Sequence, residues 1–265
     1  MNAVKAVADG AVVAKRNLIK IKRVPDLLVF TTLQPIMFVL LFVYVFGGAI
    51  AVKGSNYREF LIAGIFAQTV VFGSVITGAG LAEDIQKGII DRFRSLPMSP
   101  SAVLFGRTLS DVVNNVIVVV VMSLTGLAVG WRINTSFPKA LAGYLLLLVF
   151  AYAFSWVMAM MGLLAPSPEV VNNAAFIVIF PLTFVANTFV PIVTQPEPLR
   201  TFAAWNPVSS VTQAARELFG NIPPNTPAPG WALQHPVTYT LIWTAGILVV
   251  FVPLTTRQFR RSVSR

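Results

Sequence analysis

Residues 58–101 read REFLIAGIFAQTVVFGSVITGAGLAEDIQKGIIDRFRSLPMSPS and join two segments of opposite character. From Phe60 to Leu81 there is no charged side chain. A helix that crosses the ~30 Å hydrocarbon core of a bilayer needs about 20 predominantly apolar residues, so this part predicts a membrane span. The part that follows holds six charges within a few turns: Glu83, Asp84, Lys87, Asp91, Arg92 and Arg94. It predicts a loop in water between this span and the next.

The composition of the whole chain agrees with a protein that lies in lipid. Of 265 residues, 56% are hydrophobic and 11% are charged, whereas about 25% are charged in a typical soluble domain. Apolar runs recur along the chain without a polar block large enough to fold separately. We therefore expect an all-α membrane protein with one transmembrane domain, residues 1–265. The chain has no cysteine, which excludes disulfides and thiolate metal sites.

Six segments are long and apolar enough to span the membrane: residues 27–50, 58–81, 103–130, 140–164, 170–190 and 237–256. The positive-inside rule sets their orientation, because cytoplasmic segments carry an excess of Lys and Arg. With both termini inside, 14 of the 20 basic residues lie on the cytoplasmic side. This distribution explains the net charge of +10, and no nucleic-acid partner is expected. The sequence predicts a multi-pass protein of the cell (inner) membrane with both termini in the cytoplasm.

Three segments outside the spans have their own patterns. Residues 1–26 place apolar and basic side chains on different sides of a helix, which is typical of a helix lying in the membrane interface and contacting anionic lipids. Residues 82–97 predict a short amphipathic helix between the second and third spans. Residues 191–236 hold nine of the 18 prolines, with a tenth, Pro181, just before them. They predict short outer helices, some of them re-entrant.

The charges of the 82–97 segment need an explanation beyond stability. Exposed ion pairs contribute only ~0–1 kcal/mol each, so six charges within twelve positions favour a surface that docks a partner, since complementary charge fixes register and partner choice. A plain solvated turn is the alternative interpretation of the same residues.

Four stretches resemble the membrane subunits of type-2 ABC exporters, in particular the daunorubicin-resistance-type permeases. They are LAEDIQKGIIDRFRSLPMSPSAVLFGRTLSD from Leu81, QPIMFVLLFVYVFG in the first span, APSPEVVNN between the fourth and fifth spans, and NPVSSVTQAARELFGN in the outer segment. The resemblance covers nearly the whole chain in the same order.

The resemblance implies that residues 83–96 form a coupling helix, which sits in a groove of a separate ATPase subunit. Two permease subunits and two ATPase subunits then make the working exporter. The residues that would contact the ATPase are Glu83, Asp84, Lys87, Gly88, Asp91, Arg92, Arg94 and, in the short second loop at 165–169, Glu169. Ser167, Pro168 and Glu169 are also typical of an ordinary helix start.

The sequence contains no nucleotide-binding motif. No Gly-x-x-x-x-Gly-Lys-Ser/Thr string occurs in it, and this string is what cradles phosphates in a P-loop. We therefore expect no cofactor on this chain, with ATP and Mg²⁺ bound by the partner ATPase. His235 is the only histidine, so an enzyme of the membrane is a weaker interpretation. A secondary transporter or channel without an ATPase partner stays the alternative.

Polar side chains within the spans are candidates for a substrate path. The uncharged ones are Gln34, Gln68, Thr69, Asn114, Asn115, Asn172, Asn173 and Asn187, and we assign the path to Gln34, Gln68, Asn114, Asn115, Asn172 and Asn187. Such groups equally join helices by hydrogen bonds. Arg107 and Asp111, one turn apart near the start of the third span, are predicted to pair with each other or with the loop. Gly73, Gly78 and Gly80 predict a small-residue face for close helix packing, with the subunit interface as a candidate location.

Overall fold

The computed structural model describes residues 25–48, 50, 56–90, 100–222 and 230–263, together with Val12, Ala14 and Ile19. Nearly all of the predicted interfacial helix and residues 91–97 of the predicted coupling helix lie outside this part. In the described residues, every regular element is a helix.

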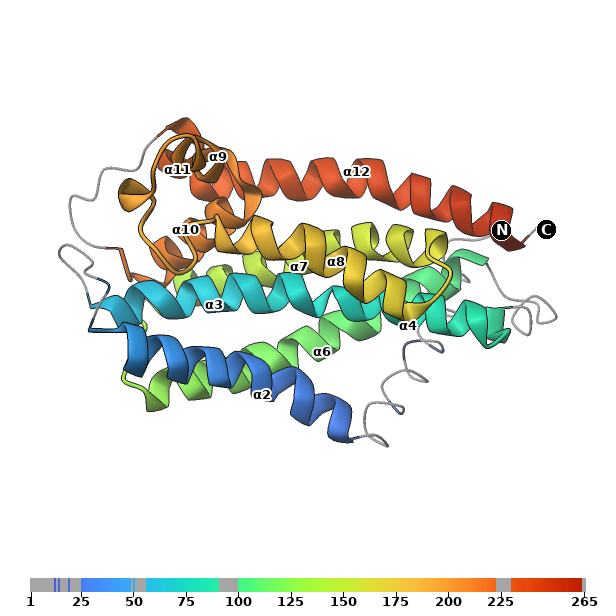
Figure 1. Ribbon diagram of the computed structural model, residues 1–265, viewed down its shortest axis with the longest axis horizontal. Helices are drawn as coiled ribbons and strands as arrows, with labels where there is room; N and C mark the ends of the chain where they lie inside the picture. The colour runs from blue at the N-terminus through green and yellow to red at the C-terminus, as the bar shows by residue number, and fades with distance from the viewer. Residues whose placement is uncertain are drawn as a thin grey trace.

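Six apolar helical segments run side by side between two ends of an elongated bundle (Figure 1). They are α2 (Pro25–Leu41) with the π-helical turn Phe42–Phe46, α3 (Tyr57–Gly73) continued by α4 (Val75–Gln86), α6 (Pro100–Ala128), α7 (Phe137–Leu164), α8 (Pro168–Phe184) and α12 (Pro236–Val263). We call the end where α4 finishes and α8 begins the loop end. The opposite end is the cap end, covered by α9 (Leu199–Trp205), α10 (Pro207–Phe219) and α11 (Trp231–Gln234).

Four of these segments are long and apolar enough to cross a membrane by length and composition: Tyr57–Gln86, Val103–Ala128, Phe137–Leu164 and Pro236–Arg261. The other two, Thr32–Phe46 and Pro168–Phe184, are shorter apolar helices. At 1.5 Å per residue, the 17 residues of α8 reach about 25 Å. The predicted fifth span, residues 170–190, therefore extends beyond the C-terminal end of the observed helix. The chain leaves the helix after Phe184 and turns toward α10.

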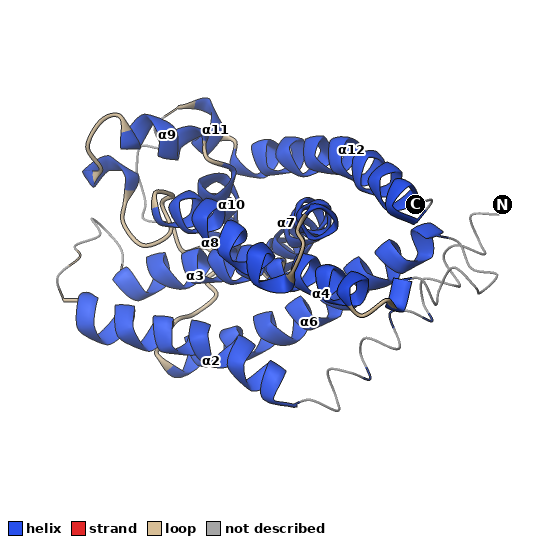
Figure 2. Ribbon diagram, turned by 45° about the vertical axis from the view of Figure 1, so that its right-hand side comes forward, coloured by secondary structure: helices blue, strands red, loops and turns tan. Residues whose placement is uncertain are grey.

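Helix α7 occupies the middle of the bundle and contacts α3, α4, α6, α8, α10 and α12 (Figure 2). Its approach to α4 is very close, because Gly78 and Gly162 face each other there. A Cβ atom on Gly162 would collide with the backbone carbonyl of Gly78, and one on Gly78 with the carbonyl of Met158. The predicted small-residue face of α4 thus packs within the chain at Gly78.

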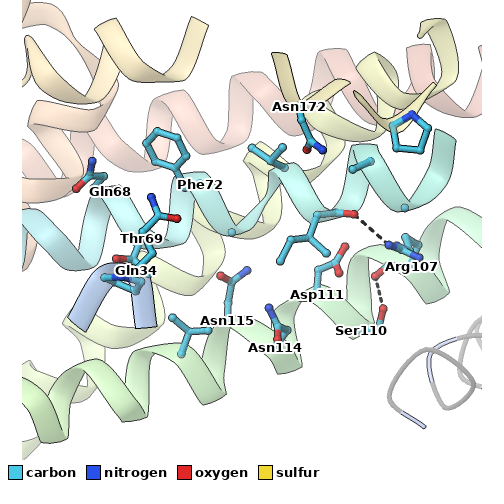
Figure 3. Close-up of a pocket in the computed structure, with 18 of the residues that line it drawn as sticks. Gln34, Gln68, Thr69, Phe72, Arg107, Ser110, Asp111, Asn114, Asn115 and Asn172 are labelled. Carbon is cyan, nitrogen blue, oxygen red and sulfur yellow. Dashed lines mark hydrogen bonds between the residues drawn. The ribbon is translucent and has the colours of Figure 1, made fainter. Parts of the chain in front are cut away.

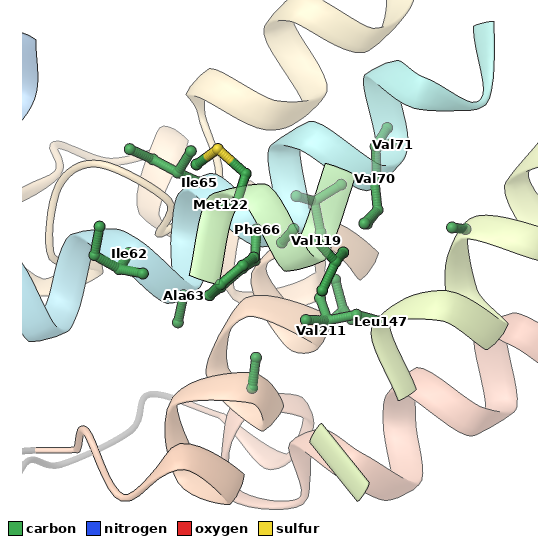
Figure 4. Packing of buried hydrophobic residues seen from close by; sticks show 14 of the residues in the cluster. Ile62, Ala63, Ile65, Phe66, Val70, Val71, Val119, Met122, Leu147 and Val211 are labelled. Carbon is green, nitrogen blue, oxygen red and sulfur yellow. The ribbon is translucent and has the colours of Figure 1, made fainter. Parts of the chain in front are cut away.

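The buried core lies at the cap-end half of the bundle and is centred on α3. Ile62, Phe66 and Val70 are fully buried there. Met122 from α6, Leu147 from α7 and Val211 from α10 pack into the same cluster (Figure 4). Outward-facing positions are also apolar: Ile177 of α8 is 71% exposed and Val249 of α12 is 73% exposed. Large apolar side chains on both the inside and the outside are typical of a bundle surrounded by lipid.

The predicted helix at 82–97 differs from the structure in its boundaries. Residues 82–86 continue the membrane helix α4, and the helix ends at Lys87 and Gly88. Gly88 has φ +64, a left-handed conformation that glycine adopts without steric cost and that commonly ends helices. A new helical turn starts at Ile89 and Ile90. The sequence pattern predicts one continuous helix because glycine is tolerated inside a helix, whereas here it interrupts the helix and redirects the chain.

Replacing Gly162 tests the contact between α4 and α7. We expect Gly162→Val to lower the unfolding temperature of the purified protein in detergent, because overpacking a tight contact costs about 1–3 kcal/mol. Gly246→Ala in α12 is the matched control, since no atom lies within 4 Å of the position of its Cβ. Equal unfolding temperatures for Gly162→Val and the wild type would show that the helices separate at this point without cost.

Candidate functional site

A cavity of about 430 Å³ lies between α2, α3, α4, α6 and α8, toward the loop end (Figure 3). Its size falls in the range of drug-sized ligand sites. The side chains around it are apolar, amide and charged: Gln34, Pro35, Phe38, Gln68, Thr69, Phe72, Gly73, Val75, Ile76, Ala79, Gly80, Glu83, Arg107, Ser110, Asp111, Asn114, Asn115, Val118, Pro168 and Asn172.

The fold creates this cavity at a break in the second long helix. Ser74 interrupts the helix between α3 and α4, and its hydroxyl donates to the carbonyl of Val71 at 2.6 Å. Lining residues come from both sides of the break, from Gln68 on α3 to Glu83 on α4. These positions face away from Gly78, so the side of α4 that is not held against α7 forms the cavity wall.

Five of the six amide residues assigned to the substrate path line this cavity: Gln34, Gln68, Asn114, Asn115 and Asn172. They come from four different helices and meet only in the folded chain. Gln34 and Asn172 are exposed, whereas Asn114 and Asn115 are buried. The side-chain oxygen of Asn115 is buried and accepts no hydrogen bond within the described part of the chain. A buried acceptor without a partner is costly, so this atom is suited to a ligand or a bound water.

The charged groups of the wall are linked to α4. Arg107 donates from Nη2 to the carbonyl of Ile76 at 3.0 Å, and its Nη1 lies 3.8 Å from a carboxylate oxygen of Asp84. Asp111, which is 5% exposed, accepts a hydrogen bond from the Thr77 hydroxyl. Arg107 was predicted to pair either with Asp111 or with the 82–97 segment. Its ion pair is with Asp84, which belongs to that segment.

Aromatic rings cover the cap-end side of the cavity. Phe38 of α2 lines the wall, and its ring centroid lies 6.2 Å from that of Phe189. The Phe189 ring in turn stacks with that of Phe42 at 4.4 Å and packs on that of Phe184 at 4.8 Å between centroids. These rings close the space between α2 and the end of α8.

Asn187, the sixth amide, does not line the cavity. It lies at the cap end, where its backbone N–H donates to the Ser209 hydroxyl at 3.1 Å and its side-chain amide donates to Gln213 at 3.3 Å. Its carbonyl accepts from Arg216 Nη2 at 2.7 Å. Asn187 therefore joins helices, the other role open to a buried amide, and its place on a substrate path stays a prediction.

Arg216 of α10 is the centre of that network. It is 1% exposed, donates from Nε to the carbonyl of Phe60 at 2.9 Å, and shares Nη2 between the carbonyls of Asn187 and Thr188. Its guanidinium carbon lies 3.5 Å from the centre of the Phe60 ring. No ion pair among the described residues involves it. Backbone carbonyls and an aromatic face therefore hold this buried cation and fix α10 against α3 and the end of α8.

The predicted docking residues are in different surroundings. Glu83 accepts from Lys87 one turn later, and this bond raises the pKa of Lys87. Asp84 is 5% exposed and faces Arg107, so its carboxylate does not lie on the outer surface. Ile90, after the turn at Gly88, is buried against Leu104 and Trp156.

The second loop has the geometry of an ordinary helix start. Ser167 caps α8 by accepting from the N–H of Val170 at 3.4 Å, Pro168 occupies the first turn, and Glu169 is exposed beside them. The docking role of Glu169 stays a prediction. Asp91, Arg92 and Arg94 lie outside the described residues.

Comparison with known proteins agrees with this architecture. The ABC-2 type transporter family matches residues 10–219. The chain belongs to the ABC-2 type transporter family. The match covers α2 to α10, and thus the whole cavity.

Three relatives of this ABC-2 chain are permeases by name. The daunorubicin resistance ABC transporter permease DrrB1 of Streptomyces coeruleorubidus is 36% identical over 92% of this chain and 83% of its own length. The probable doxorubicin resistance ABC transporter permease DrrC of Mycobacterium tuberculosis is 24% identical over 83% and 77%. The putative transport permease ycf38 of Cyanophora paradoxa is 25% identical over 79% and 73%.

Sequence reasoning assigned no path role to several members of the cavity wall. Phe38 and Phe72 are indistinguishable from core residues in an apolar run. Arg107 and Asp111 carried a usable signal, because ionisable residues inside spans are rare and are usually functional. The sequence carries no such signal for Arg216, since an arginine in an amphipathic outer helix is usually exposed.

Arg216→Met tests the cap-end network. The change leaves three backbone carbonyls without their donor, and we expect it to lower the free energy of unfolding by at least about 2 kcal/mol. Unfolding in mixed micelles titrated with a denaturing detergent measures this. The matched control is Arg200→Met. The Arg200 side chain is 44% exposed and pairs with Glu197 at 2.6 Å, so its loss should cost under about 1 kcal/mol. Similar small losses for both variants would contradict the network.

Proposed function

We propose that this chain is the six-span membrane subunit of an ATP-driven exporter that moves a hydrophobic or amphipathic compound out of the cytoplasm. Its membership of the ABC-2 family and its likeness to drug-resistance permeases support a permease of this kind. The cavity is the observation that carries the proposal, since it gathers amide groups from four helices beside aromatic rings. A compound with an apolar body and several hydrogen-bonding groups matches such a wall. Drugs, lipids and polyketides all have this character.

The orientation follows from charge and helix direction. The loop end holds the Lys87 turn and the last turns of α12 with Arg257, Arg260 and Arg261. A basic end is cytoplasmic by the positive-inside rule. The cavity then lies on the cytoplasmic half of a cell-membrane protein, and the cap end with α10 faces outward as its gate. A substrate would enter from the cytoplasm or the inner leaflet.

The energy comes from a partner in this proposal. Two ATPase subunits, with ATP and Mg²⁺, bind at the loop end of two permease subunits, the second being the same or a related chain. The turn after α4 offers exposed Lys87 and the charges that follow it in sequence. The exposed apolar sides of α8 and α12 provide surface for lipids and for the second permease.

Transport of a defined compound tests the function. Daunorubicin is the first probe, because the relative DrrB1 is named for resistance to it and because it is fluorescent. In inside-out vesicles containing the chain and its ATPase subunit, we expect ATP-dependent uptake of daunorubicin, lipid probes or both. ATP-independent uptake driven by an ion gradient would instead support a secondary transporter.

Asn115→Leu tests the cavity as the binding site. The change keeps the volume but removes the buried amide, and we expect daunorubicin to bind the purified permease about tenfold more weakly, the value of one well-placed hydrogen bond. Fluorescence titration measures the dissociation constant. Asn134→Leu is the control, since that side chain donates to Glu59 at the cap end and should leave binding unchanged. Equal weakening by both would place the site elsewhere.

Reversing the charges after the turn tests docking of the ATPase. We expect Asp91→Lys combined with Arg92→Glu to reduce copurification of the ATPase subunit and ATP-dependent uptake while the permease still inserts into the membrane, since mismatched charge opposes association. Lys139→Glu, at the cap end of α7, is the control. Undiminished copurification of the ATPase by the double variant would contradict docking at these residues.

A further inference from the structure

Arg107 lies where the cavity, the loop-end turn and α6 meet. It belongs to the cavity wall, and its side chain is 11% exposed. The side chain crosses α4 at Gly80, where a Cβ atom would overlap with the guanidinium. Glycine at this position therefore lets the cation of one helix lie directly on the backbone of the other.

Two groups of α4 converge on this cation. Carbonyl oxygens of a helix point toward its C-terminus and side chains lean toward its N-terminus. The carbonyl of Ile76 and the carboxylate of Asp84 therefore meet near Gly80, at 3.0 Å from Nη2 and 3.8 Å from Nη1 respectively. The Nε atom of Arg107 has no hydrogen-bond partner within the described residues. The hydrogen bond and the ion pair of the guanidinium thus both go to α4.

The last turn of α4 is also the start of the proposed docking turn. Asp84 lies three residues before Lys87, and Ile90 after the turn is buried against Leu104 of α6 and Trp156 of α7. The turn is thus attached to the bundle at two points: an apolar contact at Ile90 and an ion pair at Asp84. A displacement of the turn acts on Arg107 through the ion pair with Asp84.

A buried cation cannot lose its carboxylate partner without a large cost in free energy. If the last turn of α4 moves, Arg107 either follows Asp84 or turns to Asp111, which lies one helical turn along α6 in the same cavity wall. Both movements change the cavity, since Arg107 and Asp111 line its wall. The two carboxylates offer two discrete arrangements for one cation.

We infer that Arg107 is the positioning residue that couples the docking turn to the cavity, through its ion pair with Asp84. The inference rests on the proposed function, because it needs a motion supplied by the ATPase. Arg107 then changes the access and shape of the cavity without contributing to ATP hydrolysis.

The absence of native cysteine allows a direct test with one reporter thiol. Ala79→Cys places a small thiol on the cavity wall, in the full chain assembled with its ATPase subunit in lipid nanodiscs. The rate of labelling by a charged maleimide is measured without nucleotide and with ATP and Mg²⁺ under trapping by vanadate. With Arg107 present, we expect the two rates to differ by about fivefold or more, a typical coupling between sites.

Arg107→Gln in the same background is expected to give one rate in both states while the ATPase subunit still copurifies and the unfolding temperature stays close to that of the parent. Asp84→Asn should likewise give one labelling rate in both states, with a lower unfolding temperature because the buried Arg107 loses its carboxylate partner. Arg107→Lys, which keeps the charge, should give an intermediate labelling response. Arg132→Gln is the control: it changes an exposed arginine beyond the opposite end of α6 and should keep the full response.

Each outcome bears on a different claim. If the Arg107→Gln protein responds to ATP as its parent does, Arg107 does not couple the turn to the cavity. If that variant loses ATPase copurification and stability together with the response, its role is structural and the inference is overturned. If the parent with Arg107 intact shows no response to ATP although the ATPase is bound, the proposed ATP-driven function fails first.

Discussion

The close contact of α4 with α7 at Gly78 and Gly162 determines the arrangement of the loop end. It holds one side of α4 against the central helix, so the opposite side, from Ile76 to Glu83, is left to face α6 and the cavity. Close packing of small residues is a main source of helix association in membranes, because burial of apolar surface gives little advantage over lipid. Larger residues at these two positions would displace α4, and with it Asp84 and the carbonyl that receives Arg107.

Two buried arginines show how this bundle accommodates charge at its two ends. At the loop end, Arg107 has a carboxylate within reach, and the pair sits beside a cavity. At the cap end, Arg216 is held by carbonyls and the Phe60 ring. The carbonyls of Asn187 and Thr188 belong to the turns that follow α8. Arg107 thus has another carboxylate nearby, that of Asp111. Arg216 instead joins three segments through their backbone carbonyls.

The apolar runs predicted the helices well, because twenty uncharged residues leave the backbone few alternatives in lipid. Five of the six amide positions assigned to the path lie in the cavity wall, but Asn187 looks the same in sequence as Asn115. Both side-chain oxygens are buried without a partner among the described residues. Only the fold shows that the Asn187 side chain donates to Gln213 at the cap end, whereas Asn115 lies in the cavity wall. Asp84 was predicted to lie on the exposed docking surface. Helical spacing describes only near neighbours, so it could not show that Asp84 pairs with Arg107, which is 23 positions away. In the sequence, Gly88 fits within a helical pattern. Its left-handed conformation cannot be recognised there, because it depends on the chain that follows.

The cavity and the proposed docking turn share one helix, and this constrains how the proposed ATPase subunit would affect a compound in the cavity. Coupling between separate sites requires an element with two arrangements that both sites bias. Helix α4 contains the cavity wall at Ile76 and Ala79 and the turn at Lys87 within about three helical turns, roughly 16 Å. The break at Ser74 separates this short helix from α3, whose side chains are fixed in the apolar core. A displacement of the turn can therefore be absorbed by α4 between Ser74 and Gly88, which concentrates the movement on the cavity and spares the cap end.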